Sequence, residues 1–239
     1  VRPMIIEMLG WLTSAVKYKL GLKCMHRLSR LLMSNEQDKR EVLHTIQKVV
    51  VPCLEVLSEQ EGLAGMQTKE MVVGVTSLLE CKDHKKDVAK VLQRVIPLFL
   101  DWLIKTEKSQ DLQEGAHIVH ALACLTDDKD NCLQVASLEV SMKCIGAINN
   151  QSYALSDKYC DLWLNFLHLA GNLMVNGANE EIIKRFKEES VHVNVISRGR
   201  AVISAAGGGG TEWAILPIQA KTIARVCHFL AIMMTAQEQ

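Results

Sequence analysis

The chain has 239 residues, of which 49% are apolar and only 5% aromatic, so its core is expected to consist mainly of aliphatic residues. Basic and acidic residues balance at 27 each, without the basic excess on which nucleic-acid binding depends. The longest uncharged run of the most apolar segment, residues 226–237, is too short to span a bilayer. The composition therefore favours neither a nucleic-acid-binding nor a membrane-spanning protein.

The eight cysteines lie mostly in apolar, helix-like segments, with no CxxC pair and no signal-peptide pattern at the start of the chain. We expect them to be reduced thiols that pack as small apolar residues in a cytoplasmic or nuclear protein. Only four prolines interrupt the chain, which suits long helices. The chain starts with Val in an apolar helical pattern, and we interpret it as a fragment of a longer protein.

Two segments in the first half of the chain repeat each other. Residues 38–52, DKREVLHTIQKVVVP, match residues 84–97, HKKDVAKVLQRVIP, at an offset of 46. The identical pairs are Lys39 and Lys85, Val42 and Val88, Gln47 and Gln93, and Val49 and Val95. Each segment ends in a proline and is followed by a short apolar helix pattern, so each predicts two successive helices.

A leucine near the end of the preceding helix recurs at intervals of 46, 47 and 48 residues, as Leu32, Leu78, Leu125 and Leu173. A polar turn follows each leucine, and its Asn or Asp is expected to turn the chain or cap the next helix; these residues are Asn35, Asp83, Asp128 and Asn179. One such unit cannot cover its own apolar face, so neighbouring units are expected to stack.

Two of these units, ALACLTDDKDNCLQVA (121–136) and AGNLMVNGANEEIIKRF (170–186), resemble the armadillo repeat. The likeness covers roughly residues 20–200 as four units, although the usual glycine after the second helix is absent from most of them. The resemblance implies an all-α fold, a right-handed α-solenoid of four to five armadillo/HEAT-like repeats. We expect residues 1–239 to form one such domain, which binds other proteins along a groove.

In this repeat class the third helix of each unit lines the concave groove, and here that helix carries the recurring leucine. Positions one, five and eight residues before the leucine share one face of a helix. The candidate groove residues at these positions are Arg27, Leu31, Glu70, Ser77, His117, His120, Cys124, Asn165, His168 and Asn172. Such a polar row suits hydrogen bonding to a peptide or a helix, although the pattern also fits a solvated helix face.

Other motifs contain residue types that serve metal, phosphate or catalytic sites. His117, His120, Cys124 and Cys132 include zinc-ligand types, but a structural zinc site normally takes its second ligand pair from a recognisable motif such as CxxC. Residues 204–213, SAAGGGGTEW, lack the lysine of a phosphate-binding loop, and we predict a flexible loop at 204–211. We therefore expect no metal, no cofactor and no enzyme activity.

We expect a non-enzymatic scaffold or adaptor that binds a peptide or helix of another protein in the groove. The alternative is a regulatory domain that docks a folded partner, such as a small GTPase or a cytoskeletal subunit, through the turns that contain Asp127 and Asp128. Residues 213–236 are apolar nearly all round, so segment 212–239 predicts a capping or docking helix. This helix is expected to pack against more of the chain or against a partner, including a second copy.

Overall fold

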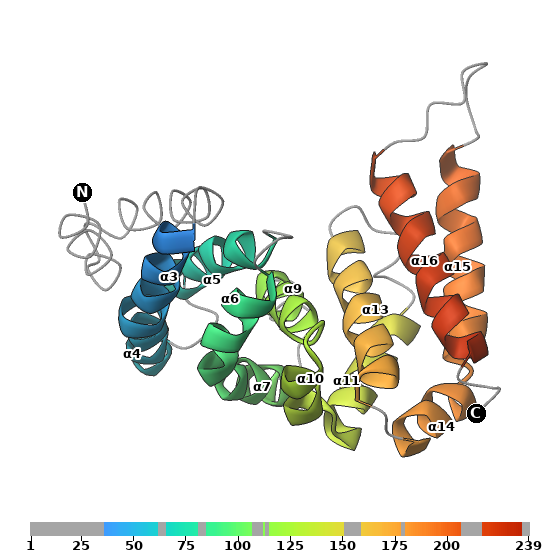
Figure 1. Ribbon diagram of the computed structural model, residues 1–239. Coiled ribbons are helices and arrows are strands. Elements are labelled where there is room, and N and C mark those ends of the chain that lie inside the picture. The colour runs from blue at the N-terminus through green and yellow to red at the C-terminus, as the bar shows by residue number, and fades with distance from the viewer. Residues whose placement is uncertain are drawn as a thin grey trace. The chain divides into compact units, whose positions relative to one another are not determined.

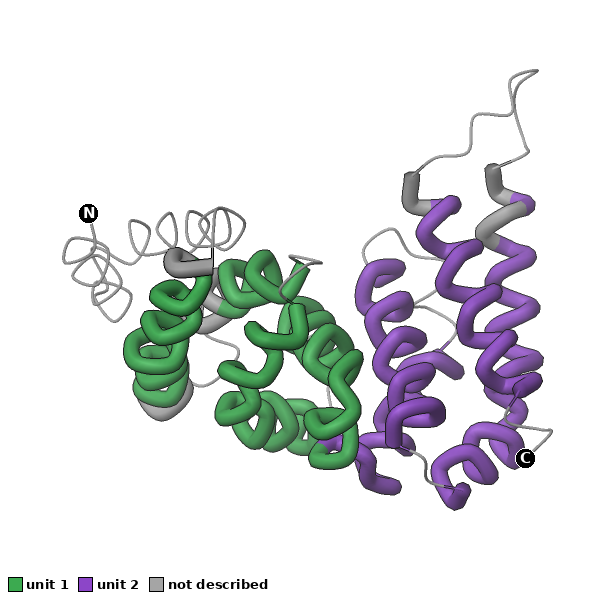
Figure 2. Tube along the Cα trace, viewed as in Figure 1, with its two compact units in different colours: residues 1–134 green, residues 135–239 purple. Residues whose placement is uncertain are grey.

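The computed structural model describes residues 36–61, 66–80, 85–106, 112, 115–150, 159–177, 180–206 and 217–235 (Figure 1). These residues are helical almost throughout and form no strand, which confirms the all-α prediction. No helix in this part of the chain combines the length and the apolar character needed to cross a membrane. The chain divides into two compact units, residues 1–134 and residues 135–239 (Figure 2).

The helices of the first unit follow one another in a recurring order. After a polar turn comes one helix, then a second, and then the helix that carries the recurring leucine. The elements are α3 (Glu36–Thr45), the π-helical turn η2 (Ile46–Val50), α4 (Val51–Glu61), α5 (Met66–Leu79), α6 (Lys85–Val91), the 3-10 turn η4 (Leu92–Val95), α7 (Ile96–Lys105), α9 (Ala116–Leu125) and α10 (Lys129–Val135), whose end meets the boundary between the units.

The second unit continues the same order of helices along the chain. Its elements are α11 (Leu138–Asn149), α13 (Cys160–Val175), α14 (Glu180–Glu188), α15 (Val191–Ala206) and α16 (Pro217–Thr235). The helices predicted after Pro52 and Pro97 are present as α4 and α7, and α11 and α15 hold the same place in chain order without a proline. By this order α16 corresponds to α5, α9 and α13.

The recurring leucines are core residues. Leu78, Leu125 and Leu173 lie near the ends of α5, α9 and α13, and all three are fully buried. Leu32 lies outside the described residues. The predicted cap is present at the one turn of the four whose Asn or Asp is described: Asp128 Oδ1 accepts hydrogen bonds from the backbone N–H groups of Asp130, at 3.1 Å, and Asn131, at 3.2 Å, where α10 begins.

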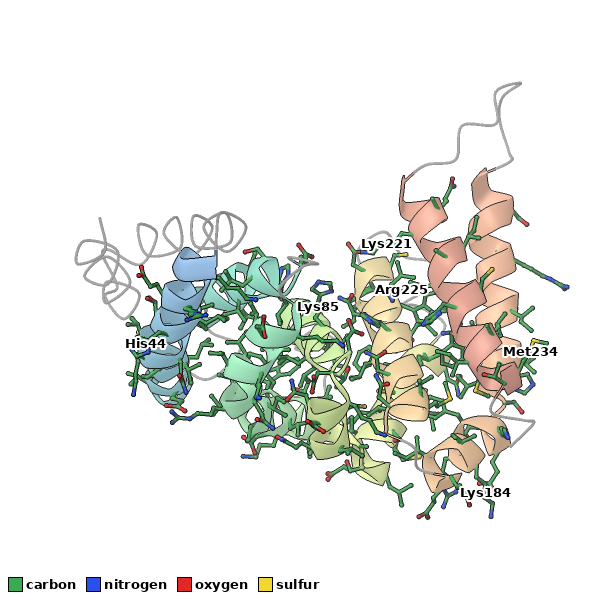
Figure 3. All side chains as sticks on the ribbon, viewed as in Figure 1. His44, Lys85, Lys184, Lys221, Arg225 and Met234 are labelled. Atoms are coloured by element: carbon green, nitrogen blue, oxygen red, sulfur yellow. The ribbon has the colours of Figure 1, made fainter. Side chains whose placement is uncertain are left out.

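Equivalent lysines make equivalent contacts in the first unit. Lys39 binds Asp87 with its Nζ at 2.8 Å, and Lys85, its match at the offset of 46 (labelled in Figure 3), binds Asp127. Each lysine thus reaches a carboxylate of the helix group that follows its own. Ion pairs near the surface contribute at most about 1 kcal/mol each, so these two pairs show mainly that the two matching segments make similar contacts.

In the second unit α13 packs against both α11 and α16. The indole Nε1 of Trp163, on α13, donates to the carbonyl oxygen of Ile148 in the last turn of α11 at 3.2 Å. Phe186 of α14 meets Phe229 of α16 edge to face, with ring centroids 6.3 Å apart. These contacts join four of the five helices around one apolar core.

The last two helices differ in their bounds from the segments predicted for them. Helix α15 continues to Ala206, so residues 204–206 of the predicted loop 204–211 are helical, and residues 207–216 lie outside the described part. Of the predicted helix 212–239, the structure describes residues 217–235 as α16, with a proline in its first turn, where proline is favoured. The two helices pack side by side (Figure 1).

Candidate functional site

A short polar row crosses two adjacent helices of the first unit. Helices α5 and α9 pack against each other, and Glu80 follows directly after the last residue of α5. His120 Nε2, on α9, lies 3.2 Å from Glu80 Oε1 and 3.7 Å from Cys124 Sγ. We call these three residues, Glu80, His120 and Cys124, the α5–α9 row.

The chemistry of the row follows from its donors and acceptors. A carboxylate only accepts hydrogen bonds, so the contact with Glu80 requires the proton of His120 to lie on Nε2. The side chain of Glu80 is 62% exposed and that of His120 is 22% exposed, while Cys124 is buried. The row therefore exposes the carboxylate of Glu80 to solvent. The imidazole of His120 contacts this carboxylate, and the thiol of Cys124 is buried.

The row does not have the arrangement of a Cys-His-acid catalytic triad. In such a triad the nucleophile and the acid contact different nitrogens of the imidazole, so that one nitrogen takes the proton while the other is held in orientation. Here Cys124 and Glu80 both approach Nε2 of His120. The acid therefore competes with the thiol for one nitrogen and cannot orient the ring toward it.

Of the other candidate residues of the first unit, the structure describes the side chains of Ser77 and His117. The Ser77 hydroxyl donates to the Gly74 carbonyl oxygen at 2.7 Å, so its proton is used within α5. His117 is exposed on α9, one turn before His120. Glu70 lies on α5, but its side chain is not described, and Arg27 and Leu31 lie outside the described residues.

The three candidates of the second unit are buried rather than set on an open polar face. Asn165, His168 and Asn172 are each only 8% exposed, as part of a helix, α13, that is buried over most of its circumference. Neighbouring helices account for this, because α13 packs against α11 on one side and α16 on another. In this unit the three candidate residues therefore lie among packed helices.

Helix α16 lies along α13 in a parallel register. Lys221 Nζ binds Asp161 at 2.7 Å near the start of both helices, and these residues are 60 positions apart. Near the ends of the same helices, a Cβ added at Gly171 would meet Ile232 Cδ1 at 3.2 Å. Within the predicted segment 213–236, residues 217–235 thus form a helix that packs on its own chain.

The turn acids of the alternative hypothesis have roles within the first unit. Asp127 pairs with Lys85, and Asp128 caps α10. The Asn131 side chain adds a hydrogen bond from its Nδ2 to the carbonyl oxygen of Ala89 at 3.2 Å, which joins α10 to α6. These contacts give the turn after α9 a structural role in packing successive helix groups.

Burial raises the pKa values of three thiols among the described residues. Burial, with a smaller contribution from Asp127, raises the pKa of Cys132 to about 12. Burial alone also raises the pKa values of Cys53 and Cys144 above the usual range of a thiol. Among the described residues no group of three or more His, Cys, Asp or Glu side chains is arranged to hold a metal ion.

Thiol labelling should separate these cysteines. With a pKa of about 12, only about one Cys132 side chain in ten thousand is a thiolate at pH 8, whereas Cys227 is exposed on α16. We expect iodoacetamide to alkylate Cys227 in the folded protein and to reach Cys132 and Cys144 only after unfolding. Peptide mapping by mass spectrometry after a timed reaction measures this, and rapid labelling of Cys132 in the folded chain would contradict the structure.

Sequence reasoning found His120 and Cys124 but missed Glu80, the only one of the three with a largely exposed side chain. Its position in the turn directly after α5, beside a recurring leucine helix, was the available signal. Comparison with known proteins gives no match: no family model matches the chain, and no match was found among curated proteins or among solved structures.

Proposed function

We propose that the chain is a non-enzymatic scaffold built from armadillo-like three-helix repeats, which binds a peptide or helix of another protein. The observation that carries this proposal is the α5–α9 row, in which two successive leucine-bearing helices present an oriented carboxylate to solvent. In the proposed repeat the row belongs to the groove face, where a partner would lie across both helices.

The row favours a ligand that supplies hydrogen-bond donors. Glu80 has one oxygen, Oε1, at 3.2 Å from His120, and the exposed part of its carboxylate can accept from a partner. Because His120 already restricts the carboxylate, less side-chain freedom is lost when a ligand binds. A backbone N–H, a lysine or an arginine of a bound segment would satisfy it.

No observation favours the alternative of docking a folded partner through the turns. Asp127 is paired with Lys85, and the Asp128 carboxylate accepts two backbone hydrogen bonds. A partner that used either carboxylate would compete with these contacts. We therefore keep the α5–α9 row as the proposed binding face.

Affinity capture with mass spectrometry tests this proposal when it is done with matched variants. Wild-type chain is compared with Glu80→Ala and His120→Ala, and with Asp127→Ala as a control that removes a turn carboxylate. We expect the affinity of the captured partner to fall at least about tenfold in the two row variants, as for a central contact in an interface. Loss of binding in the Asp127→Ala variant alone would support turn-mediated docking and contradict the proposal.

A further inference from the structure

An apolar stripe runs along one face of the last two helices. Val193 and Ile196 of α15 are 53% and 37% exposed, and Met234, near the end of α16, is 67% exposed (Figure 3). On the same helix as Met234, Leu230 and Ile223 precede it by 4 and 11 residues, and both are half-buried. Large apolar side chains so exposed, and grouped on one helix pair, mark an interaction surface rather than scattered surface residues.

The middle of this stripe is hollow. An open pocket of about 140 Å³ lies between the two helices, with apolar lining from Ile196, Gly199, Ile223, Val226, Cys227 and Leu230. Gly199 allows the close approach beside it, because a Cβ at this position would lie 3.1 Å from Val226 Cγ1. A cavity of roughly 150 Å³ accommodates a benzene molecule, so the pocket is large enough for one leucine or phenylalanine side chain.

The charged side chain that lines the pocket is a cation. Arg200 lines the pocket and is exposed, and no described residue forms an ion pair with it. Helices α15 and α16 contain no Asp or Glu. The nearest acidic residue along the chain, Glu189, precedes α15 and is 11 positions from Arg200.

Helical spacing places Arg225, the arginine of α16, away from the stripe. Ile223, Cys227 and Leu230 recur at intervals of four and three residues on one face. Arg225, two residues from Ile223, lies on the opposite side of the helix, the side of Ile232 that faces Gly171 of α13. Arg200 is therefore the cation of the stripe.

We propose that the α15–α16 stripe binds an acidic amphipathic helix of a partner protein. One apolar side chain of this helix fills the pocket, its neighbours at intervals of three and four residues cover Ile196 and Met234, and a carboxylate pairs with Arg200. From Ile223 to Met234 the stripe extends 11 residues, about 16 Å, which matches three turns of a bound helix.

The charged residues of the stripe also argue against a membrane surface or a second copy of the chain as the ligand. An anionic membrane surface is recognised by clusters of four to eight basic residues, whereas the stripe has a single arginine. A second copy of the chain would present the same acid-free helix pair and offer no carboxylate to Arg200. The inference rests on the proposed scaffold function, but it uses a surface separate from the α5–α9 row.

Defined peptides test the occupant directly on the full chain. Three fluorescent peptides of about 18 residues, or five helical turns, are compared: an amphipathic Leu/Glu helix, an amphipathic Leu/Lys helix and a scrambled form of the first. We expect the Leu/Glu helix to bind at least about tenfold more tightly than either of the others in anisotropy titrations, because only it matches both the apolar pattern and the charge.

Variants then locate the binding. Arg200→Glu is expected to reverse the preference toward the Leu/Lys helix, and Ile196→Asp to weaken both amphipathic helices about tenfold or more. Lys184→Glu, which makes the same charge change on an exposed lysine of α14 (Figure 3), serves as the control and should leave the Leu/Glu affinity within about twofold. Circular dichroism confirms that each variant is folded.

Several results would overturn the inference. Equal binding of the Leu/Glu and Leu/Lys helices would reject the charge match. Binding that survives Ile196→Asp would reject the proposed location. Binding to anionic phosphatidylserine vesicles in place of the peptide would assign the stripe to a membrane. Self-association that Ile196→Asp abolishes would assign it to a second copy. None of these results changes the expected effect of Glu80→Ala, so the scaffold proposal is tested separately.

Discussion

Trp163→Ala is expected to lower the free energy of unfolding by about 4 kcal/mol, the largest effect of any single substitution proposed for this chain. Trp163 is fully buried and is the largest such side chain among the described residues. Its removal opens a cavity between α13 and α11 and deprives the Ile148 carbonyl oxygen of its indole donor. Urea unfolding followed by circular dichroism measures the change.

Trp163→Phe separates the two contributions, because it keeps much of the apolar volume but removes the donor. We expect a smaller loss, of about 1–2 kcal/mol. Hydrogen exchange should show that Trp163→Ala lowers protection first in α13, which carries Trp163, and in α11 and α16, which pack against α13. Equal stability of Trp163→Ala and wild type would show that α13 does not pack as described.

Gly115→Ala is expected to destabilise the first unit by about 2–3 kcal/mol through overpacking. Gly115 is the residue before α9, and a Cβ built there would overlap the indole ring of Trp102, which is itself 8% exposed. The backbone at Gly115 has a φ of −84°, which alanine adopts without strain, so the effect isolates the clash with Trp102. Thermal unfolding monitored by circular dichroism gives the size of the loss.

Gly146→Ala makes the same chemical change where it should stabilise. Gly146 is exposed inside α11, and a Cβ there would meet no atom within 4 Å. Alanine favours a helix over glycine by about 0.5–1 kcal/mol, so we expect a gain of that size. If Gly115→Ala and Gly146→Ala changed the free energy of unfolding in the same direction, the surroundings described for one of the two glycines would be wrong.

The helix order of this chain could be predicted from local sequence patterns. The recurring leucines, the polar turns and the Lys39/Lys85 match depend on spacing alone, and the structure places Leu78, Leu125 and Leu173 in the core and pairs both lysines with carboxylates. Asp128 acts as the predicted cap, because helix capping is decided within a few residues along the chain.

Burial of the second unit's candidates could not be predicted in the same way. Whether Asn165, His168 and Asn172 face solvent depends on what packs against α13, and α16 does so from residues about 60 positions further along the chain. That interval exceeds the 46–48 residues between the recurring leucines, so the leucine spacing does not identify α16 as a further copy. Its apolar character all round was the visible sign that it would be covered.

The α5–α9 row shows the same division between local and distant information. Helical spacing within α9 placed His120 and Cys124 together, and the structure brings them to 3.7 Å. Glu80 belongs to the preceding helix group, 40 residues earlier, and only the packing of α5 on α9 sets it beside His120. A row that joins two helices therefore required the tertiary structure.

Hydrogen exchange of the full chain, with and without its captured partner, tests the scaffold proposal most directly. We expect the partner to slow exchange in α5 and α9, around Glu80 and His120, and Glu80→Ala to remove this protection. Protection confined to the turn that contains Asp127 and Asp128, with α5 and α9 unchanged, would contradict the proposal.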